Sequence, residues 1–212
     1  MVELLDGIHA IKIADADGLD TEVYLIECEG GLILIDVGFT QQCLNSIYSG
    51  LEDVGKNWED IKLILITHPH GDHIDNLPEV LSKTGAEIMI GAEDIDELEE
   101  KTGIRADIGL RTGDTIGACG GVIAIEVPGH SKGNLSFLLP AYETLIAGDT
   151  LVGDEEGNLL PPPEKYCEDA DEALKNISVL LDYSFNKMLL THGKNIMDDA
   201  RSRVKKLVEA SS

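Results

Sequence analysis

Short apolar runs separated by glycine-rich turns characterise the first part of the chain. The pattern predicts strands at Gly7–Ile13, Glu22–Cys28 and Leu32–Asp36, with the pair Gly30-Gly31 marking the turn between the last two. Ile61–Ile66 is a continuous apolar run, short enough for a strand that is buried on both faces. The early part of the chain is therefore predicted to form a group of strands.

Helices and strands are predicted to alternate after this group. Apolar positions at helical spacing, and an acidic segment at Ala92–Lys101, predict the helices. The predicted helices are Gln41–Val54, Asp72–Ser82, Ala92–Lys101, Asp169–Leu181 and Ile196–Ala210. Further strands are predicted at Ala86–Ile90, Val122–Val127, Leu135–Leu139, Thr144–Ala147 and Lys187–Thr191. This order favours a layered α/β fold with helices covering sheet faces, in one domain over residues 1–212.

The chain is strongly acidic. Its 212 residues include 40 Asp and Glu against 16 Lys and Arg, which gives a formal net charge of −24. Such a surface repels phosphate backbones and anionic lipid head groups, so we expect neither nucleic acid nor a membrane as a partner. No basic segment followed by a long apolar stretch stands at the start, and the four cysteines contain no CxxC pair. We therefore expect a cytoplasmic protein without a disulfide framework.

The run His68-Pro69-His70-Gly71-Asp72-His73 is the strongest chemical signal in the sequence. Imidazole and carboxylate groups are the usual ligands of zinc and similar divalent ions. An extended loop lets His68 and His70 point the same way, whereas Asp72 and His73 turn at a helix start and can face a second centre. The run therefore predicts a metal site.

Three more candidate ligands follow later predicted strands: His130, Asp149 and His192. Each stands beside a glycine, which lets backbone segments approach closely. Taken singly, each residue is more typical of a structural histidine or a turn aspartate. Their occurrence in order after the histidine run favours one functional site over three separate structural roles.

At these residues the sequence resembles the metallo-β-lactamase superfamily. The motifs of that family are HxHxDH, a PGH loop, a GD strand end and a late His-Gly, and all occur here in order over nearly the whole chain. The resemblance implies an αββα four-layer sandwich with two divalent metal ions at the edge between two sheets. Zinc is the first expectation, and iron or manganese also suits His and Asp ligands.

The resemblance also implies a ligand set. By carry-over, His68, His70 and His130 would bind the first ion, Asp72, His73 and His192 the second, and Asp149 would bridge both. Two ions about 3.5–4 Å apart can share a hydroxide that attacks a carbonyl carbon. Asp72, which would orient this hydroxide, and the bridging Asp149 are the predicted catalytic residues. Asp36 is a candidate for holding a ligand imidazole, and a plain turn aspartate is an equally good interpretation.

Departures from known branches of the family narrow the predicted substrate. The β-lactamases that use a cysteine ligand carry it where Asp149 stands here. The hydroxyacylglutathione hydrolases match the ligands but usually have a second histidine where this chain has Asn134, and they add a helical C-terminal region that the 20 residues after His192 cannot supply. The lactonases share the metal motifs, but their active-site tyrosine has no clear counterpart here, although Tyr166 lies in a plausible loop. Lys132 could meet a substrate carboxylate.

Other branches of the family fit less well. The net charge of −24 disfavours the RNA-processing branch. The flavin-partnered diiron branch replaces an early histidine with glutamate, whereas His70 is intact.

We therefore predict a metal-dependent hydrolase of a small ester, thioester or lactone. One alternative is an enzyme that holds a single iron on His68, His70 and His130, or a subset of them, and oxidises persulfides. Another is a non-catalytic metal- or ligand-binding module of the same fold, which the complete ligand set disfavours because a binder needs no shared hydroxide. The expected partner is a small-molecule substrate, and the sequence does not indicate an oligomeric state.

Overall fold

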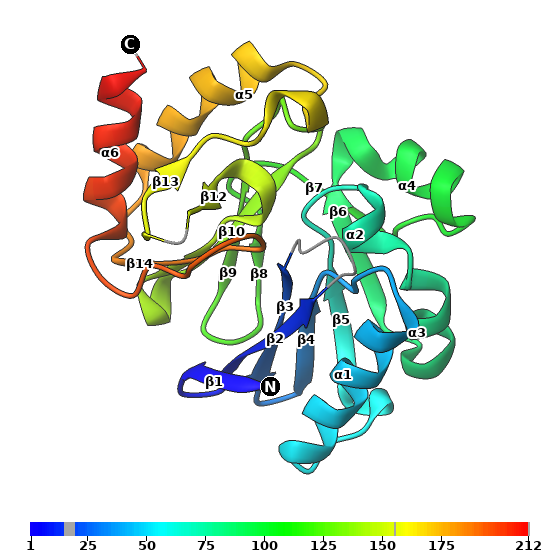
Figure 1. Ribbon diagram of the computed structural model, residues 1–212. Helices are drawn as coiled ribbons and strands as arrows, with labels where there is room; N and C mark the ends of the chain where they lie inside the picture. Colours follow the sequence, from blue (N-terminus) through cyan, green and yellow to red (C-terminus); the bar gives the residue numbers. More distant parts are fainter. Residues whose placement is uncertain (15–19, 155, 212) are drawn as a thin grey trace. The chain divides into compact units, whose positions relative to one another are not determined.

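The computed structural model describes residues 1–14, 20–154 and 156–211. The chain forms two compact units, Met1–Gly109 and Leu110–Ser212 (Figure 1). Each unit has its own sheet, its own helices and its own cluster of buried apolar side chains. The single domain expected over residues 1–212 stays a prediction.

The first unit is built on a seven-stranded sheet whose spatial order equals the chain order. Neighbouring strands pair antiparallel as far as β4, whereas β4, β5 and β6 run parallel. The strands are β1 (Val2–Leu5), β2 (Ile8–Ala14), β3 (Asp20–Cys28), β4 (Gly31–Ile35), β5 (Ile61–Leu65), β6 (Glu87–Gly91) and β7 (Ile108–Leu110). The predicted strands of this region are confirmed, and β1 and β7 are additional.

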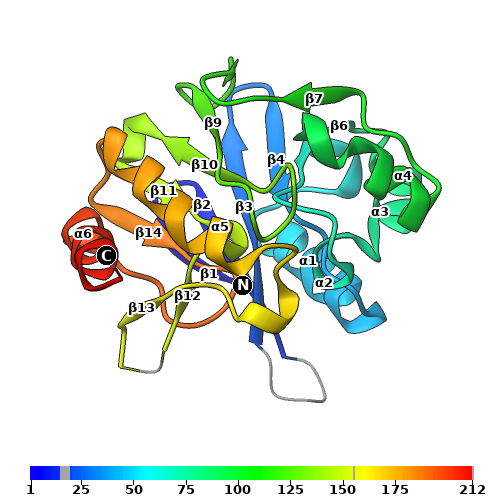
Figure 2. The same ribbon diagram turned by 90° about the horizontal axis from the view of Figure 1, so that it is seen from above.

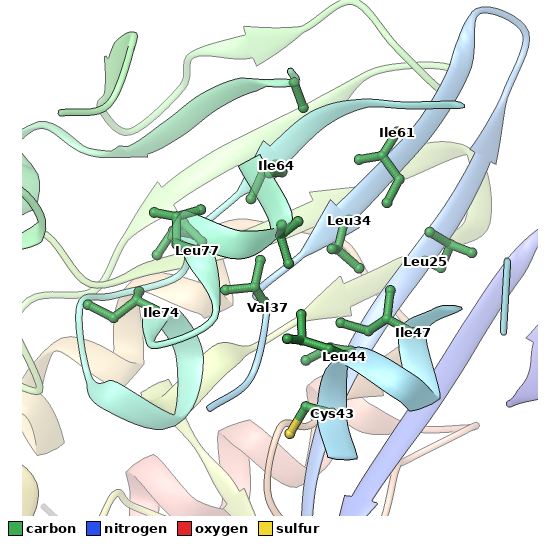
Figure 3. Close-up of a cluster of buried hydrophobic side chains, with 14 of the residues drawn as sticks. Leu25, Leu34, Val37, Cys43, Leu44, Ile47, Ile61, Ile64, Ile74 and Leu77 are labelled. Atoms are coloured by element: carbon green, nitrogen blue, oxygen red, sulfur yellow. The ribbon is translucent and has the colours of Figure 1, made fainter. Parts of the chain in front are cut away.

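Helices of the first unit pack on one face of its sheet. They are α1 (Gln41–Asp53), α2 (Gly71–Ile74), α3 (Leu77–Thr84) and α4 (Ile95–Thr102). Figure 3 shows Ile47 of α1 and Leu77 directed toward Leu34 and Ile64 of the strands, and these side chains belong to one buried cluster. Ile64 and Leu65 of β5 point to opposite faces and are both fully buried, as the continuous apolar run predicted.

The second unit has a five-stranded sheet in the order β14-β11-β10-β9-β8 and a small sheet of β12 and β13. Strand β10 is antiparallel to β9 and β11, whereas β11 and β14 run parallel. The strands are β8 (Thr115–Ile116), β9 (Val122–Glu126), β10 (Leu135–Leu139), β11 (Thr144–Ile146), β12 (Val152–Gly153), β13 (Leu159–Leu160) and β14 (Lys187–Leu189).

Helices α5 (Ala170–Asn176) and α6 (Ala200–Ala210) lie on the same side of this sheet (Figure 2). Val204 of α6 and Ile177, directly after α5, are fully buried in one cluster with Leu145 and Met188 of the strands. This packing stabilises the second unit in the same way as α1 and α3 stabilise the first.

The predicted helix Asp72–Ser82 is wrong as a single element. Helix α2 ends at Ile74, and α3 begins at Leu77 with Pro78 in its first turn, where a missing N–H costs nothing. The backbone N–H of Asn76 donates to Gly38 O at 3.1 Å, and its side chain donates to Val37 O. These contacts with a distant loop break the helix.

The last two predicted helices are also shorter than expected. The backbone of Ile196 pairs with Met188 through N–O distances of 2.8 and 2.9 Å, so that segment is extended and α6 begins at Ala200. The predicted helix Asp169–Leu181 divides into α5 and a 3₁₀ segment at Ile177–Asp182. Sequence periodicity does not separate these arrangements from one continuous helix.

The cysteines differ from expectation. Cys28, at the end of β3, is disulfide-bonded, and so is Cys119 in the second unit, whereas Cys43 and Cys167 are free thiols. The sequence predicted no disulfide framework. That prediction is wrong for Cys28 and Cys119, because spacing along the chain reports only on local pairs. Among the described residues, no helix is both long enough and apolar enough to cross a membrane.

Replacing Ile47 with Ala should destabilise the protein by about 2–5 kcal/mol, because the side chain is fully buried between α1 and the sheet. The exposed Ser49 on the same helix provides the control, and Ser49→Ala should change stability by less than about 0.5 kcal/mol. Urea unfolding monitored by circular dichroism measures both. Equal midpoints for the two variants would contradict this packing.

Candidate metal centre

Asp36 lies at the point where the parallel strands β4 and β5 end. Its backbone N–H donates to Leu65 O at 2.9 Å, and its φ of 60° places it in the left-handed region that few non-glycine residues adopt. The residue is 2% exposed, and one carboxylate oxygen accepts the backbone N–H of Thr67 at 2.9 Å. The other accepts the Thr67 hydroxyl at 2.9 Å. This carboxylate therefore joins the ends of the two strands.

The same carboxylate orients His73. Asp36 Oδ2 lies 2.8 Å from His73 Nδ1, so the ring donates its proton from Nδ1 to the carboxylate. The Nε2 atom of the ring then carries a lone pair and points away from Asp36. A carboxylate on the far nitrogen of an imidazole is the usual support of a metal-ligating histidine. Asp36 thus contacts an imidazole, which favours the first of the two interpretations that the sequence left open.

The histidine loop brings the rings of His68, His70 and His73 together. The His68 ring lies 4.5 Å from that of His70 and 4.0 Å from that of His73, measured between centroids. Thr67 Oγ1 lies 3.1 Å from His68 Nδ1, which leaves Nε2 of that ring for another partner. Asp72 Oδ2 lies 3.4 Å from His73 Nε2. The first unit therefore brings four predicted ligands together.

Lys101, in the last turn of α4, supports the same loop. Its Nζ donates to Pro69 O at 2.8 Å and pairs with Glu97 at 2.6 Å. Lys101 was not predicted from the sequence, because a lysine 32 positions away carries no local sign of the contact. Thr67 was missed for another reason: its hydroxyl gains a role only through the position of Asp36.

Asp149 is the centre of the ligands in the second unit. It sits in a short 3₁₀ turn, Gly148–Thr150, that follows β11, while His192 follows the parallel strand β14. Asp149 Oδ2 lies 3.5 Å from Nε2 of His130 and 3.5 Å from Nε2 of His192. One carboxylate oxygen approached by two imidazole nitrogens is a donor set that suits a divalent ion.

The loop that carries His130 is held against α5. Gly129 has a φ of +126°, and a Cβ there would lie 2.1 Å from Ala173 N. Asp169 N–H donates to Gly129 O at 2.9 Å, and Asn176 Nδ2 donates to Pro128 O at 3.0 Å. The glycine of the PGH motif is therefore required by close packing.

Cys167 contacts the other nitrogen of the His130 ring. Its Sγ lies 3.7 Å from His130 Nδ1. Burial, and to a lesser degree the charges of Asp149 and Glu164, raise the pKa of the Cys167 thiol, which keeps it protonated near neutral pH.

Lys132 and Tyr166 lie at the surface of this unit. Lys132 is 71% exposed and lies 3.9 Å from Glu168, and Tyr166 is 44% exposed. Their suggested roles toward substrate stay predictions.

The predicted ligands thus fall into two sets. His68, His70, Asp72 and His73 belong to the first unit, and His130, Asp149 and His192 to the second. Both sets contribute side chains to the groups of His and Asp residues that could hold a metal ion.

Comparisons with known proteins agree with the sequence motifs. A family model described as the metallo-beta-lactamase superfamily matches residues 16–192. The uncharacterized protein YobT of Bacillus subtilis (strain 168) is 30% identical over 200 residues, which cover 81% of this chain and 82% of that protein. A hydroxyacylglutathione hydrolase of Fuscovulum blasticum is 39% identical over 98 residues, which cover 45% of this chain and 36% of the hydrolase.

A solved structure has the same fold. A metallo-beta-lactamase family protein of Thermus thermophilus superimposes with a TM-score of 0.78, at 20% identity, over 99% of this chain and 80% of that one. The predicted fold class is confirmed.

Gly129→Ala should destabilise the protein more than Gly113→Ala. Both glycines have a positive φ, but a Cβ at Gly113 meets nothing within 4 Å, so that variant reports the backbone strain alone, about 1–3 kcal/mol. The clash with Ala173 should add about 1–3 kcal/mol for Gly129→Ala. Chemical denaturation measures the difference, and equal losses would contradict the close packing of the PGH loop.

Asp36→Asn should change the tautomer of His73. The amide cannot accept from His73 Nδ1 and the Thr67 hydroxyl with its NH₂ group, so we expect the ring proton to move to Nε2 and stability to fall by about 1–3 kcal/mol. Asp60→Asn is the control, because the Asp60 carboxylate accepts the Asn57 N–H near the surface and does not contact a histidine among the described residues. Nitrogen-15 NMR of the imidazoles in metal-free protein detects the change, and an unaltered His73 signal would contradict the assignment.

Proposed function

Because the chain belongs to the metallo-β-lactamase superfamily, we propose that it is a metal-dependent hydrolase of a small ester, thioester or lactone. The main support is the donor set itself. Each of the seven proposed ligands lies in one of the family motifs. In addition, two residues that are not ligands contact the Nδ1 atoms of His73 and His68 and thereby orient these rings. The Asp36 carboxylate accepts a hydrogen bond from Nδ1 of His73, and the Thr67 hydroxyl contacts Nδ1 of His68.

The proposed metal ligands follow the family pattern. His68, His70 and His130 would hold one ion, Asp72, His73 and His192 a second, and Asp149 both. Within the second unit, the position of one Asp149 oxygen between two imidazole nitrogens supports the bridging role. When bound, two divalent ions, with zinc as the first expectation, supply deprotonated water near neutral pH and polarise a carbonyl oxygen.

Side chains of the protein would orient the attacking water and the ligand imidazoles. Asp72 is partly exposed and can accept a hydrogen bond from the attacking water at its carboxylate, while Asp36 holds the His73 proton at Nδ1. Cys167 Sγ contacts Nδ1 of His130, the ring nitrogen opposite the Nε2 atom that would bind the metal. In this proposal no protein nucleophile is required, and Asp72 and Asp149 are the catalytic residues.

The substrate is proposed only as a class. The matched hydroxyacylglutathione hydrolase shares 98 aligned residues, and the match covers 36% of its length, so its substrate does not transfer to this chain directly. Asn134 also stands where a histidine is usual in that branch. A small carbonyl compound is the proposed partner, and the net charge of −24 argues against nucleic acid or an anionic membrane.

Elemental analysis of the purified protein tests the proposal. We expect about two zinc-type ions per chain, retained in His9→Ala and lost in His68→Ala. His9 is the matched control, because it is also a buried histidine of the first unit but pairs with Glu27 at 2.8 Å. The loaded wild type should hydrolyse members of a panel of simple esters, thioesters and lactones, and His68→Ala should not.

Other outcomes separate the alternatives. A single iron per chain with oxidation of a persulfide would replace the hydrolase by an oxygen-dependent enzyme of the same family. Metal-free protein, even after reloading with zinc, iron and manganese, would contradict both enzyme proposals and leave the binding module.

A further inference from the structure

A buried polar cluster lies beneath the ligands of the second unit. It consists of Asn134, directly before β10, Ser136, the second residue of that strand, and Thr150, directly after Asp149. Asn134 and Ser136 are fully buried, and Thr150 is 2% exposed. Polar side chains in such surroundings cost stability unless they are hydrogen-bonded, so their arrangement requires a reason.

The hydrogen bonds of this cluster have one consistent direction. Asn134 Nδ2 donates to Val127 O at 3.0 Å and to Thr150 Oγ1 at 2.8 Å. Ser136 Oγ donates to Ala147 O at 2.9 Å, which uses its only proton. The Thr150 hydroxyl therefore donates to Ser136 Oγ across 3.0 Å. The chain of donors runs from the amide of Asn134 through two hydroxyl groups to a backbone carbonyl.

This chain of hydrogen bonds connects the two segments that carry ligands. Val127 directly precedes the loop Pro128-Gly129-His130, and Ala147 and Thr150 flank Asp149 on either side. Antiparallel pairing of β10 with β11 places the start of one strand beside the end of the other. The cluster therefore connects the backbone before His130 to the backbone around Asp149. The Nε2 atom of His130 and Oδ2 of Asp149 lie 3.5 Å apart.

We propose that Asn134, Ser136 and Thr150 are positioning residues that hold His130 and Asp149 in register for metal binding. This inference rests on the proposed function, since it concerns the same ligands. Asn134 suits the position because its amide offers two N–H groups to two acceptors, which neutral histidine or aspartate cannot do. Hydrogen bonds behind metal ligands typically contribute about 10–100-fold to metal affinity.

A threonine elsewhere in the same sheet provides the matched control. Thr144 is fully buried at the start of β11, and its hydroxyl donates to Tyr142 O at 2.9 Å. It lies at the opposite end of that strand from Asp149. Thr144→Val and Thr150→Val therefore remove the same chemical group at the same level of burial, and only the second removes a link between ligands.

The experiment compares Thr150→Val, Thr150→Ser and Thr144→Val in the full chain. Zinc affinity is measured by competition with a chromogenic chelator, and unfolding by urea. We expect both valine variants to lose similar stability, but zinc affinity to fall about 10–100-fold in Thr150→Val alone. Thr150→Ser, which keeps the hydroxyl, should restore most of the affinity. Equal zinc affinity in the two valine variants would overturn the proposal.

A second measurement does not depend on metal. In metal-free protein, the imidazole NMR signal of His130 should broaden or shift in Thr150→Val and stay as in wild type in Thr144→Val. If wild type binds no zinc, the proposed function fails, and this signal alone decides the positioning role: no change in Thr150→Val overturns it. If Thr150→Val does not fold, Ser136→Ala replaces it, because that variant removes the bond to Ala147 and the acceptor of the Thr150 hydroxyl but keeps both hydrogen bonds of Asn134.

Discussion

The buried carboxylate of Asp36 is the contact on which the first unit's candidate ligands depend. It accepts hydrogen bonds from the backbone and hydroxyl of Thr67 and from the ring of His73. Three groups from two segments of the chain are thereby fixed relative to one another, and the Thr67 hydroxyl extends the same network to His68. Asp36 adopts a left-handed backbone conformation, with φ at 60°, which few non-glycine residues adopt because it is strained. In this conformation its carboxylate contacts both Thr67 and His73.

Both units use the same device to bring candidate ligands together. In the first, Asp36 and the histidine loop follow the adjacent parallel strands β4 and β5, and in the second, Asp149 and His192 follow the adjacent parallel strands β11 and β14. Parallel strands end at the same edge of a sheet, so residues distant in the sequence meet there. The strands are buried and hydrogen-bonded to their neighbours, which favours accurate positioning of side chains by the loops at their ends.

The family relationship and the local chemistry answer different questions. The family model matches residues 16–192 and establishes the family and the fold, and the chain has His and Asp groups that could hold a metal ion. Substrate choice depends on loops and buried neighbours that vary within a family. Asn134 is one such buried neighbour, since its amide donates to two acceptors beside the segments that carry His130 and Asp149.

The sequence by itself determined the main strands, the family and the seven candidate ligands, because apolar runs and motif spacing are local properties. Only the tertiary structure decided which groups serve those ligands. The helix break at Asn76 depends on Gly38, and the start of α6 depends on the pairing of Ile196 with Met188. The link from Asn134 to Thr150 likewise joins residues 16 positions apart. Such contacts follow from strand pairing and packing, which no local pattern encodes.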